Sequence, residues 1–266
     1  MTELDLAYAA MVAAADDDDT PRLHYYAALA DGEMILVLEV EAKGGNITPK
    51  VFDLEDGPVV LAFDSDDKLA AFAAGTVPYA ALPGRVIAQQ LAGQGIGLAV
   101  NLGAASMMLF PPDAVAWLAE TLAGTVTEAE AVPVAFAAPV GIPDSFLQVL
   151  RAKLGRARGR AAGAVLSAVT YADGRRGHVL ALIDAQGGTE DGLARAVNEA
   201  LIFSGLDAAE MDVVFLPGTD ARLALMQAQG LMLDLLVPPP ASLPDPAAQS
   251  AAKAPGTDPN RPPILR

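Results

Sequence analysis

The stretch from Pro58 to Leu122 constrains the fold of this chain more than any other. Short apolar runs alternate within it with segments long enough for helices, and Gly, Pro or Asp stands at nearly every junction. Short apolar runs between such breakers are typical of buried strands, and longer periodic segments are typical of helices. The stretch is therefore predicted to form a compact α/β unit, and it carries almost no reactive side chains.

Capping residues place the helices of this unit. Ser65 is a favourable N-cap for a helix over 66–74, because its hydroxyl can accept a hydrogen bond from a free amide of the first turn. Gly75 is a typical residue for ending that helix. Pro83 is expected at the start of the next helix, since proline needs no backbone donor there. A strand is predicted over Val59–Phe63, directly before the first of these helices.

A second unit of strands and helices is predicted after residue 142. Two apolar runs, Ala161–Tyr171 and His178–Ile183, flank Asp173–Gly177, whose Asp-Gly step is a hairpin signal. The hairpin supplies antiparallel pairing, and the helices after it return the chain for later strands, so a mixed sheet is expected. Val132–Phe136 is either part of a linker or an edge strand leading into this unit.

These patterns predict an α/β (α+β) fold with two small domains, each a mixed β-sheet flanked by helices. A length of 266 residues suits two domains of ordinary size. The predicted boundaries are 1–124 for the first domain, 125–142 for a linker and 143–238 for the second domain. Residues 239–266 are rich in proline and poor in large apolar side chains, so a disordered C-terminal tail is expected.

Composition excludes several classes of function. The chain has no cysteine, which rules out disulfides, thiolate nucleophiles, iron–sulfur clusters and cysteine-based zinc sites. Its net charge is −16, and residues 1–130 carry 20 acidic against 5 basic side chains, a surface that repels nucleic acid and anionic membranes. The acidic start is unlike a signal peptide, and Val86–Pro112, though uncharged, is broken by polar residues and glycines. A soluble, cytoplasmic protein is expected.

Three turn motifs in the first unit resemble the N-terminal domain of the SseB family of bacterial proteins. Phe63-Asp64-Ser65 stands where the family has a Phe-Thr/Ser-like step before a helix, and Leu82-Pro83-Gly84 matches its Leu-x-Gly step. Asn101-Leu102-Gly103 matches an Asn-Pro-Gly turn, with leucine in place of proline. Residues 161–238 also look like the SseB C-terminal domain. The resemblance implies a two-domain fold and brings no enzyme activity with it.

The resemblance and the lack of a catalytic motif together favour a non-enzymatic protein-interaction or regulatory protein. Its partner is then expected to be another protein, with no membrane and with nucleic acid disfavoured. Neither the residues nor the resemblance predicts a cofactor or a metal. The acidic N-terminal half and one basic segment are the expected contact regions.

That basic segment places five cations within ten residues of an otherwise acidic chain: Arg151, Lys153, Arg156, Arg158 and Arg160. Cations suit the C-terminal end of a helix, which is expected over 145–153, but the later arginines lie beyond it. The segment is predicted to be an interaction surface that docks on the acidic N-terminal half or on a partner protein. RNA binding is less favoured, because no aromatic residues interleave the arginines to stack bases. A solvated loop without function is the remaining alternative.

Other candidate sites have simpler structural interpretations. The two histidines, His24 and His178, lack the spacing of a metal site. Gly93-x-Gly95-x-Gly97 follows a predicted helix and precedes a strand, the reverse of the order in a dinucleotide site. The run Asp16–Asp19 lacks the alternation and the central glycine of a calcium loop. Each is interpreted as a turn or a solvated surface feature.

An alternative function is a small-molecule-binding protein or a hydrolase that uses a cleft between the two domains. It requires five polar residues to converge on one pocket: His24, Tyr25, Tyr26, Asn101 and Arg85. Their types suit a binding site, but their positions in the sequence do not show whether they meet.

Overall fold

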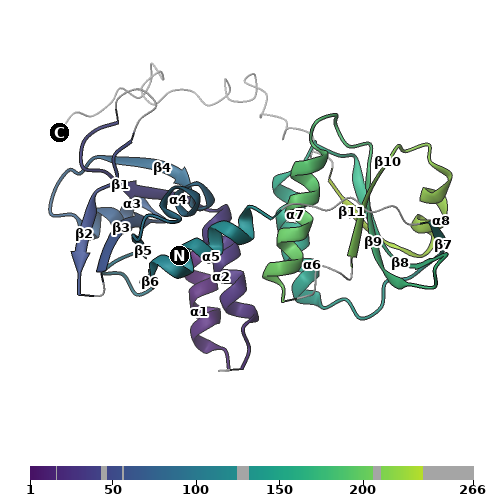
Figure 1. The fold of residues 1–266 in the computed structure, drawn as a ribbon, viewed down its shortest axis with the longest axis horizontal. Helices are drawn as coiled ribbons and strands as arrows, with labels where there is room; N and C mark the ends of the chain where they lie inside the picture. Colours follow the sequence, from purple (N-terminus) through teal and green to yellow (C-terminus); the bar gives the residue numbers. More distant parts are fainter. Residues whose placement is uncertain (16, 43–46, 56, 125–131, 206–210, 236–266) are drawn as a thin grey trace, which may run out of the picture. The chain divides into compact units, whose positions relative to one another are not determined.

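The computed structural model describes residues 1–15, 17–42, 47–55, 57–124, 132–205 and 211–235. Over these residues the chain forms eight helices and eleven strands arranged in two mixed sheets (Figure 1), which confirms the predicted α+β class. Residues Met1–Leu235 form one compact unit. The predicted tail, 239–266, and the start of the predicted linker, 125–131, lie outside the described residues. The domain boundaries proposed from the sequence stay a prediction.

The first sheet has six strands in the order β4-β1-β3-β5-β6, with β2 paired to β3. The strands are β1 (Glu33–Val37), β2 (Val51–Leu54), β3 (Gly57–Phe63), β4 (Tyr79–Pro83), β5 (Gly97–Val100) and β6 (Met108–Phe110). The pair β3 and β5 is parallel, and the other neighbours are antiparallel. The carboxyl ends of β3 and β5 therefore lie next to each other.

Five helices accompany this sheet: α1 (Glu3–Ala13), α2 (Thr20–Asp31), α3 (Asp66–Phe72), α4 (Gly84–Leu91) and α5 (Pro112–Leu122). Side chains of α1, α2, α4 and α5 form one apolar core with the sheet, and Leu69 of α3 packs with residues of the opposite face. The Ser65 cap is confirmed, since its hydroxyl accepts a hydrogen bond from the Lys68 amide at 3.4 Å. The helix ends at Phe72, two residues before the predicted end.

One predicted strand is shorter than expected. The apolar run MILVLEVE, 34–41, is strand-like to Glu41, but β1 ends at Val37, and Leu38 makes only an isolated bridge with Pro49. Val40, just beyond, is 57% exposed. Alternation of apolar residues thus continued past the point where the chain leaves the sheet.

The second sheet has five strands in the order β10-β9-β8-β11, with β7 also paired to β8. The strands are β7 (Pro133–Ala137), β8 (Gly163–Tyr171), β9 (Arg176–Ile183), β10 (Met211–Leu216) and β11 (Leu231–Asp234). The β8–β9 hairpin is antiparallel as predicted, and β9 and β10 are parallel. Strand β11 pairs with 163–166 and β7 with 168–171, so they follow each other along one side of β8.

Strand β7 settles the alternative that the sequence left open for Val132–Phe136. Its antiparallel pairing with β8 makes it an edge strand of the second sheet, inside the stretch that was predicted as a linker. Proline at its first position agrees with this assignment, because an edge strand tolerates the missing amide donor.

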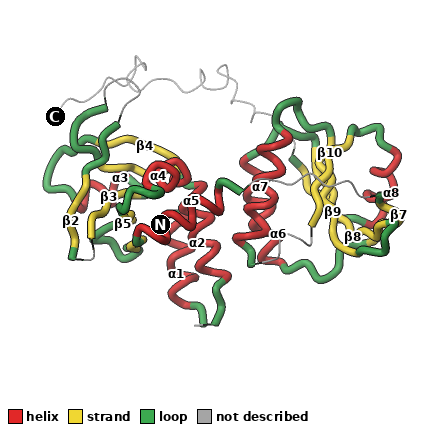
Figure 2. The backbone as a smooth tube through the Cα atoms, viewed as in Figure 1, coloured by secondary structure: helices red, strands yellow, loops and turns green. Residues whose placement is uncertain are grey.

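Three helices complete this part: α6 (Asp144–Arg156), α7 (Glu190–Phe203) and α8 (Ala221–Gln229). Figure 2 shows α6 and α7 together beside the second sheet. Their apolar side chains share a core with alternate residues of β8 and β9, such as Leu166 and Leu180, whereas α8 packs with Val165 and its neighbours on the other face. None of the helices within the described ranges has the length and apolar character needed to cross a membrane.

Candidate interaction surface

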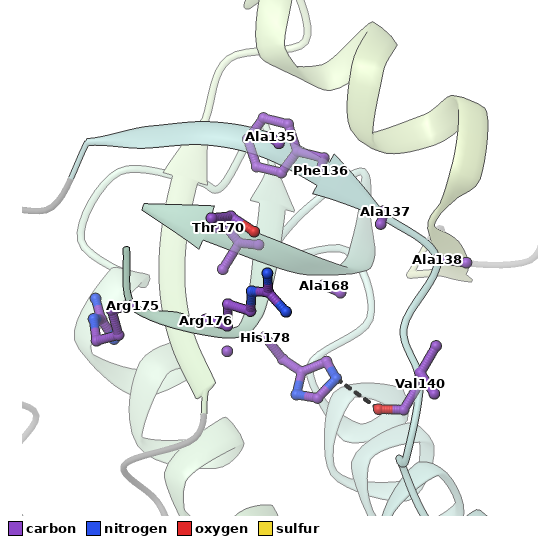
Figure 3. Close-up of a pocket in the computed structure, with 12 residues that line it drawn as sticks. Ala135, Phe136, Ala137, Ala138, Val140, Ala168, Thr170, Arg175, Arg176 and His178 are labelled. Atoms are coloured by element: carbon purple, nitrogen blue, oxygen red, sulfur yellow. Dashed lines mark hydrogen bonds between the residues drawn. The ribbon is translucent and has the colours of Figure 1, made fainter. Parts of the chain in front are cut away.

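An open hollow of about 670 Å³ lies over β7, β8 and the start of β9 (Figure 3). Two cross-strand rows form its floor. Ala137, Ala168 and His178 occupy paired positions on the three strands, and Ala135, Thr170 and Arg176 form the next row. The side chains nearest the edge are small, and each row ends in a basic residue on β9. The hollow therefore exists because alanine and threonine leave the strand surface uncovered.

His178 is held at the wall of this hollow. Its Nε2 lies 3.1 Å from the carbonyl oxygen of Val140, as Figure 3 shows. A carbonyl oxygen can only accept, so Nε2 carries the proton of this hydrogen bond. The contact fixes the segment that follows β7 against the sheet, and Val140 itself is 78% exposed.

The two arginines of the hairpin have different surroundings. Arg175 stacks over the Tyr171 ring, 4.1 Å from its centroid, and its Nη1 lies 3.1 Å from Asp212 Oδ2. Burial and the hydrogen bond to Asp212 raise the pKa of Tyr171, which therefore stays a neutral donor. Among the residues that the structure describes, Arg176 has no carboxylate partner, and it is exposed. Arg176 is thus the charge that the fold leaves available beside the hollow.

The outer edge of β7 borders the hollow. Strand β8 is its one pairing partner in the described part of the chain, so its other edge presents unpaired backbone groups. Val134 is 61% exposed on this strand. Only the start of the strand carries a proline, and no charged side chain occurs within 133–137. Proline and an irregular register between Pro133 and Ala135 protect only the start of the strand, and the rest, 135–137, is a template for pairing with another chain.

The structure buries Lys153, one of the five cations of the predicted interaction segment. Its side chain is 4% exposed, with Nζ 2.6 Å from Glu199 Oε2 and 2.9 Å from Asp31 Oδ2. Nζ also lies 5.2 Å from the centroid of the Phe203 ring. The residue lies on the inner face of α6, where its positive charge pairs with two carboxylates of the same protein.

The other four cations of the segment remain exposed. Arg156 lies 2.6 Å from Asp31 Oδ2 and 3.3 Å from Glu3 Oε2, so it also contacts the acidic N-terminal half. Arg151, Arg158 and Arg160 are exposed. Lys153 and Arg156 thus both contact acidic residues of the N-terminal half, and the role of the five cations as an interaction surface stays a prediction.

Lys153 belongs to a group of four charges that we call the charge cluster: Asp31, Arg85, Lys153 and Glu199, of which Arg85 is partly exposed and the others are buried. The Arg85 guanidinium donates to both oxygens of Glu199 at 3.0 and 3.1 Å, and it also pairs with Asp31. Desolvation lowers the pKa of Arg85, but the hydrogen bonds and charges of Glu199 and Asp31 outweigh it and raise that pKa. Two positive and two negative charges thus pair with one another, and the exposed Arg156 adds a further cation beside Asp31.

The five residues required for the alternative cleft lie in separate clusters. Arg85 is in the charge cluster, whereas Tyr25 and Tyr26 pack with Phe110 in an aromatic group of the first core. None of the five lines the hollow described above. The structure therefore does not bring them to one pocket.

Two of those five carry buried atoms without partners. Within the described residues, neither His24 Nε2 nor the Tyr25 hydroxyl has a hydrogen-bond partner. Burial lowers the pKa of His24 and raises the pKa of Tyr25, so both stay neutral at neutral pH. They contribute to packing as uncharged side chains.

Asn101, the fifth, belongs to a polar network at the carboxyl ends of β3 and β5. Its Oδ1 accepts from the Asp64 amide at 3.1 Å, and its Nδ2 donates to Ser106 Oγ at 3.3 Å. Ser106 Oγ donates to Asp5 at 2.6 Å, and Lys68 Nζ lies 2.5 Å from Asp5 and 2.7 Å from Asp64. The network joins the start of α1 to the sheet and is satisfied internally.

Acid should weaken this network through Asp5. Burial raises the pKa of Asp5, but hydrogen bonds from Lys68 and Ser106 hold it well below its ordinary value of 3.8. A group whose pKa is depressed by folding stabilises the protein above its unfolded pKa, and that contribution is lost as the pH falls. We expect the free energy of unfolding, measured in urea, to decrease from about pH 5 to about pH 2. Asp5→Asn should lose less over this window, and equal losses would contradict the assignment.

Among the described residues, no group of three or more His, Asp or Glu side chains is arranged to hold a metal ion.

The sequence analysis did not predict that Arg176 and His178 would lie together beside the hollow. Arg176 and His178 were interpreted only as hairpin residues, although their spacing of two places them on one face of a strand. This spacing of two residues was the one sequence feature that could have predicted the pair.

Comparison with protein families gives one finding. The model of the family described as SseB protein N-terminal domain matches residues 7–117. The match covers the first sheet with its helices and ends before the second sheet begins, so the resemblance of 161–238 to an SseB C-terminal domain stays a prediction. Searches against curated proteins and against solved structures give no match.

Proposed function

Because residues 7–117 place this chain in the SseB family, we propose that it is a non-enzymatic protein that acts by binding another protein. The observation that carries the proposal is the open edge of β7 beside the hollow. Apolar, uncharged edge strands favour pairing with an added strand, and natural proteins usually protect them.

The use of the buried charges supports the non-enzymatic part of the proposal. Asp31, Lys153 and Glu199 are each at most 5% exposed in their side chains, and they satisfy one another. Catalytic groups are usually held with an unmatched charge or a perturbed pKa that faces a cleft. Here the buried ionisable groups hold the protein together, and the exposed surface is left for recognition.

A site-specific crosslink tests this function. A photo-reactive amino acid at Val134 should join the full chain to one protein in the cell that makes it. The reason is that Val134, 61% exposed, lies on the open edge strand. Leu225 on α8, which is 63% exposed, is the matched control position and should give no such adduct. The adducts are identified by mass spectrometry.

The same protein must be recovered from Val134 at stoichiometric yield and not from Leu225. If both positions give the same mixture of proteins, or neither gives an adduct, β7 is not a binding edge and the proposal is wrong. A ligand-binding or hydrolytic role is not proposed, since the five residues that it requires are dispersed.

A further inference from the structure

We infer that the partner segment which binds at β7 is an extended, acidic stretch of polypeptide that adds a strand to the second sheet and places glutamate side chains over the hollow. This inference rests on the proposed function and specifies the chemistry of the partner. It is carried by the pairing register of β7, β8 and β9 and by the charge of Arg176, which no carboxylate of the described residues pairs.

The register defines where the side chains of an added strand would lie. The rows Ala135–Thr170–Arg176 and Ala137–Ala168–His178 are two residues apart along β7. A strand that pairs with β7 continues both rows, so two of its side chains, spaced by two residues, face the hollow. Small residues separate this position from Arg176, so long side chains can meet above them.

The distance favours glutamate over aspartate. Three strand spacings of about 4.8 Å separate an added strand from β9, a total of about 14 Å. An arginine side chain that extends across Thr170 covers part of this distance, and a long carboxylate must cover the rest. Figure 3 shows the Arg176 side chain directed over the sheet near Thr170 and Ala168, with Arg175 apart from them at the left of the view.

Charge complementarity selects the occupant. Arg176 has no carboxylate partner within the described residues, whereas neighbouring Arg175 is paired with Asp212. A second copy of this chain would present its own β7, whose sequence PVAFA supplies no carboxylate. Residues 131–237, which include β7, β8 and β9, carry 11 acidic and 9 basic side chains. The part of the chain around the hollow is therefore nearly neutral, unlike the strongly acidic first half. At physiological salt the field of that half is screened within about 8 Å.

Synthetic peptides test the inference on the full chain. The first peptide alternates valine with glutamate, the second replaces glutamate with lysine, and the third replaces it with aspartate. A fourth keeps the valine–glutamate sequence but carries N-methyl groups on alternate amides, which removes the donors needed for strand addition. Binding is measured by fluorescence anisotropy, and protection of the β7 amides by hydrogen exchange.

We expect the glutamate peptide to bind most tightly and to slow hydrogen exchange over 134–137, with the N-methylated peptide inactive. Arg176→Glu should weaken the glutamate peptide about tenfold or more and strengthen the lysine peptide, because like charges repel and opposite charges attract across the hollow. Arg195→Glu, at an exposed arginine of α7, is the matched control and should leave both affinities unchanged.

Three outcomes overturn the inference. They are equal affinity for the glutamate and lysine peptides, unchanged binding in Arg176→Glu, or binding of the N-methylated peptide. If one of these occurs while Val134 still crosslinks a single protein, the proposed function stands and only the partner chemistry is wrong. Self-association of the full chain through β7 would instead show that the occupant is a second copy.

Discussion

Replacing Glu199 with alanine is expected to lower the free energy of unfolding by about 3–5 kcal/mol, because it leaves buried cations without their partner. Glu199 accepts two hydrogen bonds from Arg85 and pairs with Lys153 at 2.6 Å, and its side chain is 2% exposed. Asp31 alone then faces Arg85, Lys153 and the exposed Arg156. Equilibrium unfolding in urea, followed by circular dichroism, measures the loss.

Two control variants separate the loss of the charge pairing from the loss of side-chain volume: alanine at an exposed glutamate, and a double variant that removes both partners of one buried ion pair. Glu120 is exposed on α5, so Glu120→Ala should change stability by less than about 0.5 kcal/mol. The double variant Lys153→Met with Glu199→Leu removes one charge of each sign and leaves Asp31 paired with Arg85 and Arg156. It should be more stable than Glu199→Ala, since apolar replacement of a buried pair costs little. A double variant as unstable as Glu199→Ala would show that the charges are not the cause.

Gly84→Ala should destabilise the protein by about 3 kcal/mol, as expected for severe overpacking. A Cβ at this position would lie 2.0 Å from the carbonyl oxygen of Leu29 and 2.9 Å from its carbonyl carbon. Both are backbone atoms and cannot rotate away. The Gly84 amide also donates to the Gly32 carbonyl at 3.0 Å, so the start of α4 is fixed against the end of α2. Urea unfolding again gives the change in free energy.

The same substitution at Gly155 should have the opposite sign. Gly155 lies within α6, and a Cβ there meets nothing within 4 Å. Alanine should therefore stabilise the helix by up to about 1 kcal/mol, through its better helix propensity. If Gly84→Ala and Gly155→Ala shift stability equally, the close approach of α4 to α2 is not what requires glycine at 84.

Local signals predicted many of the elements well. Ser65 caps the helix that follows it, and the Asp-Gly step at 173–174 joins the two antiparallel strands of the hairpin. Each of these depends on a few consecutive residues and their backbone preferences, which the sequence states directly. The ends of elements were predicted less well, as the early end of β1 at Val37 shows. Strand length depends on which neighbour is present to pair, and that neighbour is distant in the sequence.

The candidate sites were predicted less well than the fold, because their members are far apart along the chain. Asp31, Arg85 and Glu199 have no spacing that links them, so Lys153 was assigned to a surface when its partners were unknown. Arg176 appeared as one of two hairpin arginines. Only the tertiary structure shows that Arg175 pairs with Asp212, whereas Arg176 has no carboxylate partner among the described residues.

The amino-acid sequence by itself determined the periodicity, the caps, the turns and the lack of thiol chemistry, and through its turn residues the resemblance to the SseB family. Those features depend on neighbouring residues along the chain. Tertiary structure alone decided that Lys153 is buried, that Gly84 admits no side chain, and that β7 has β8 as its one partner strand within the described residues. Electrostatic pairing and steric contact act through space, so residues distant in sequence had to be brought together before either was defined.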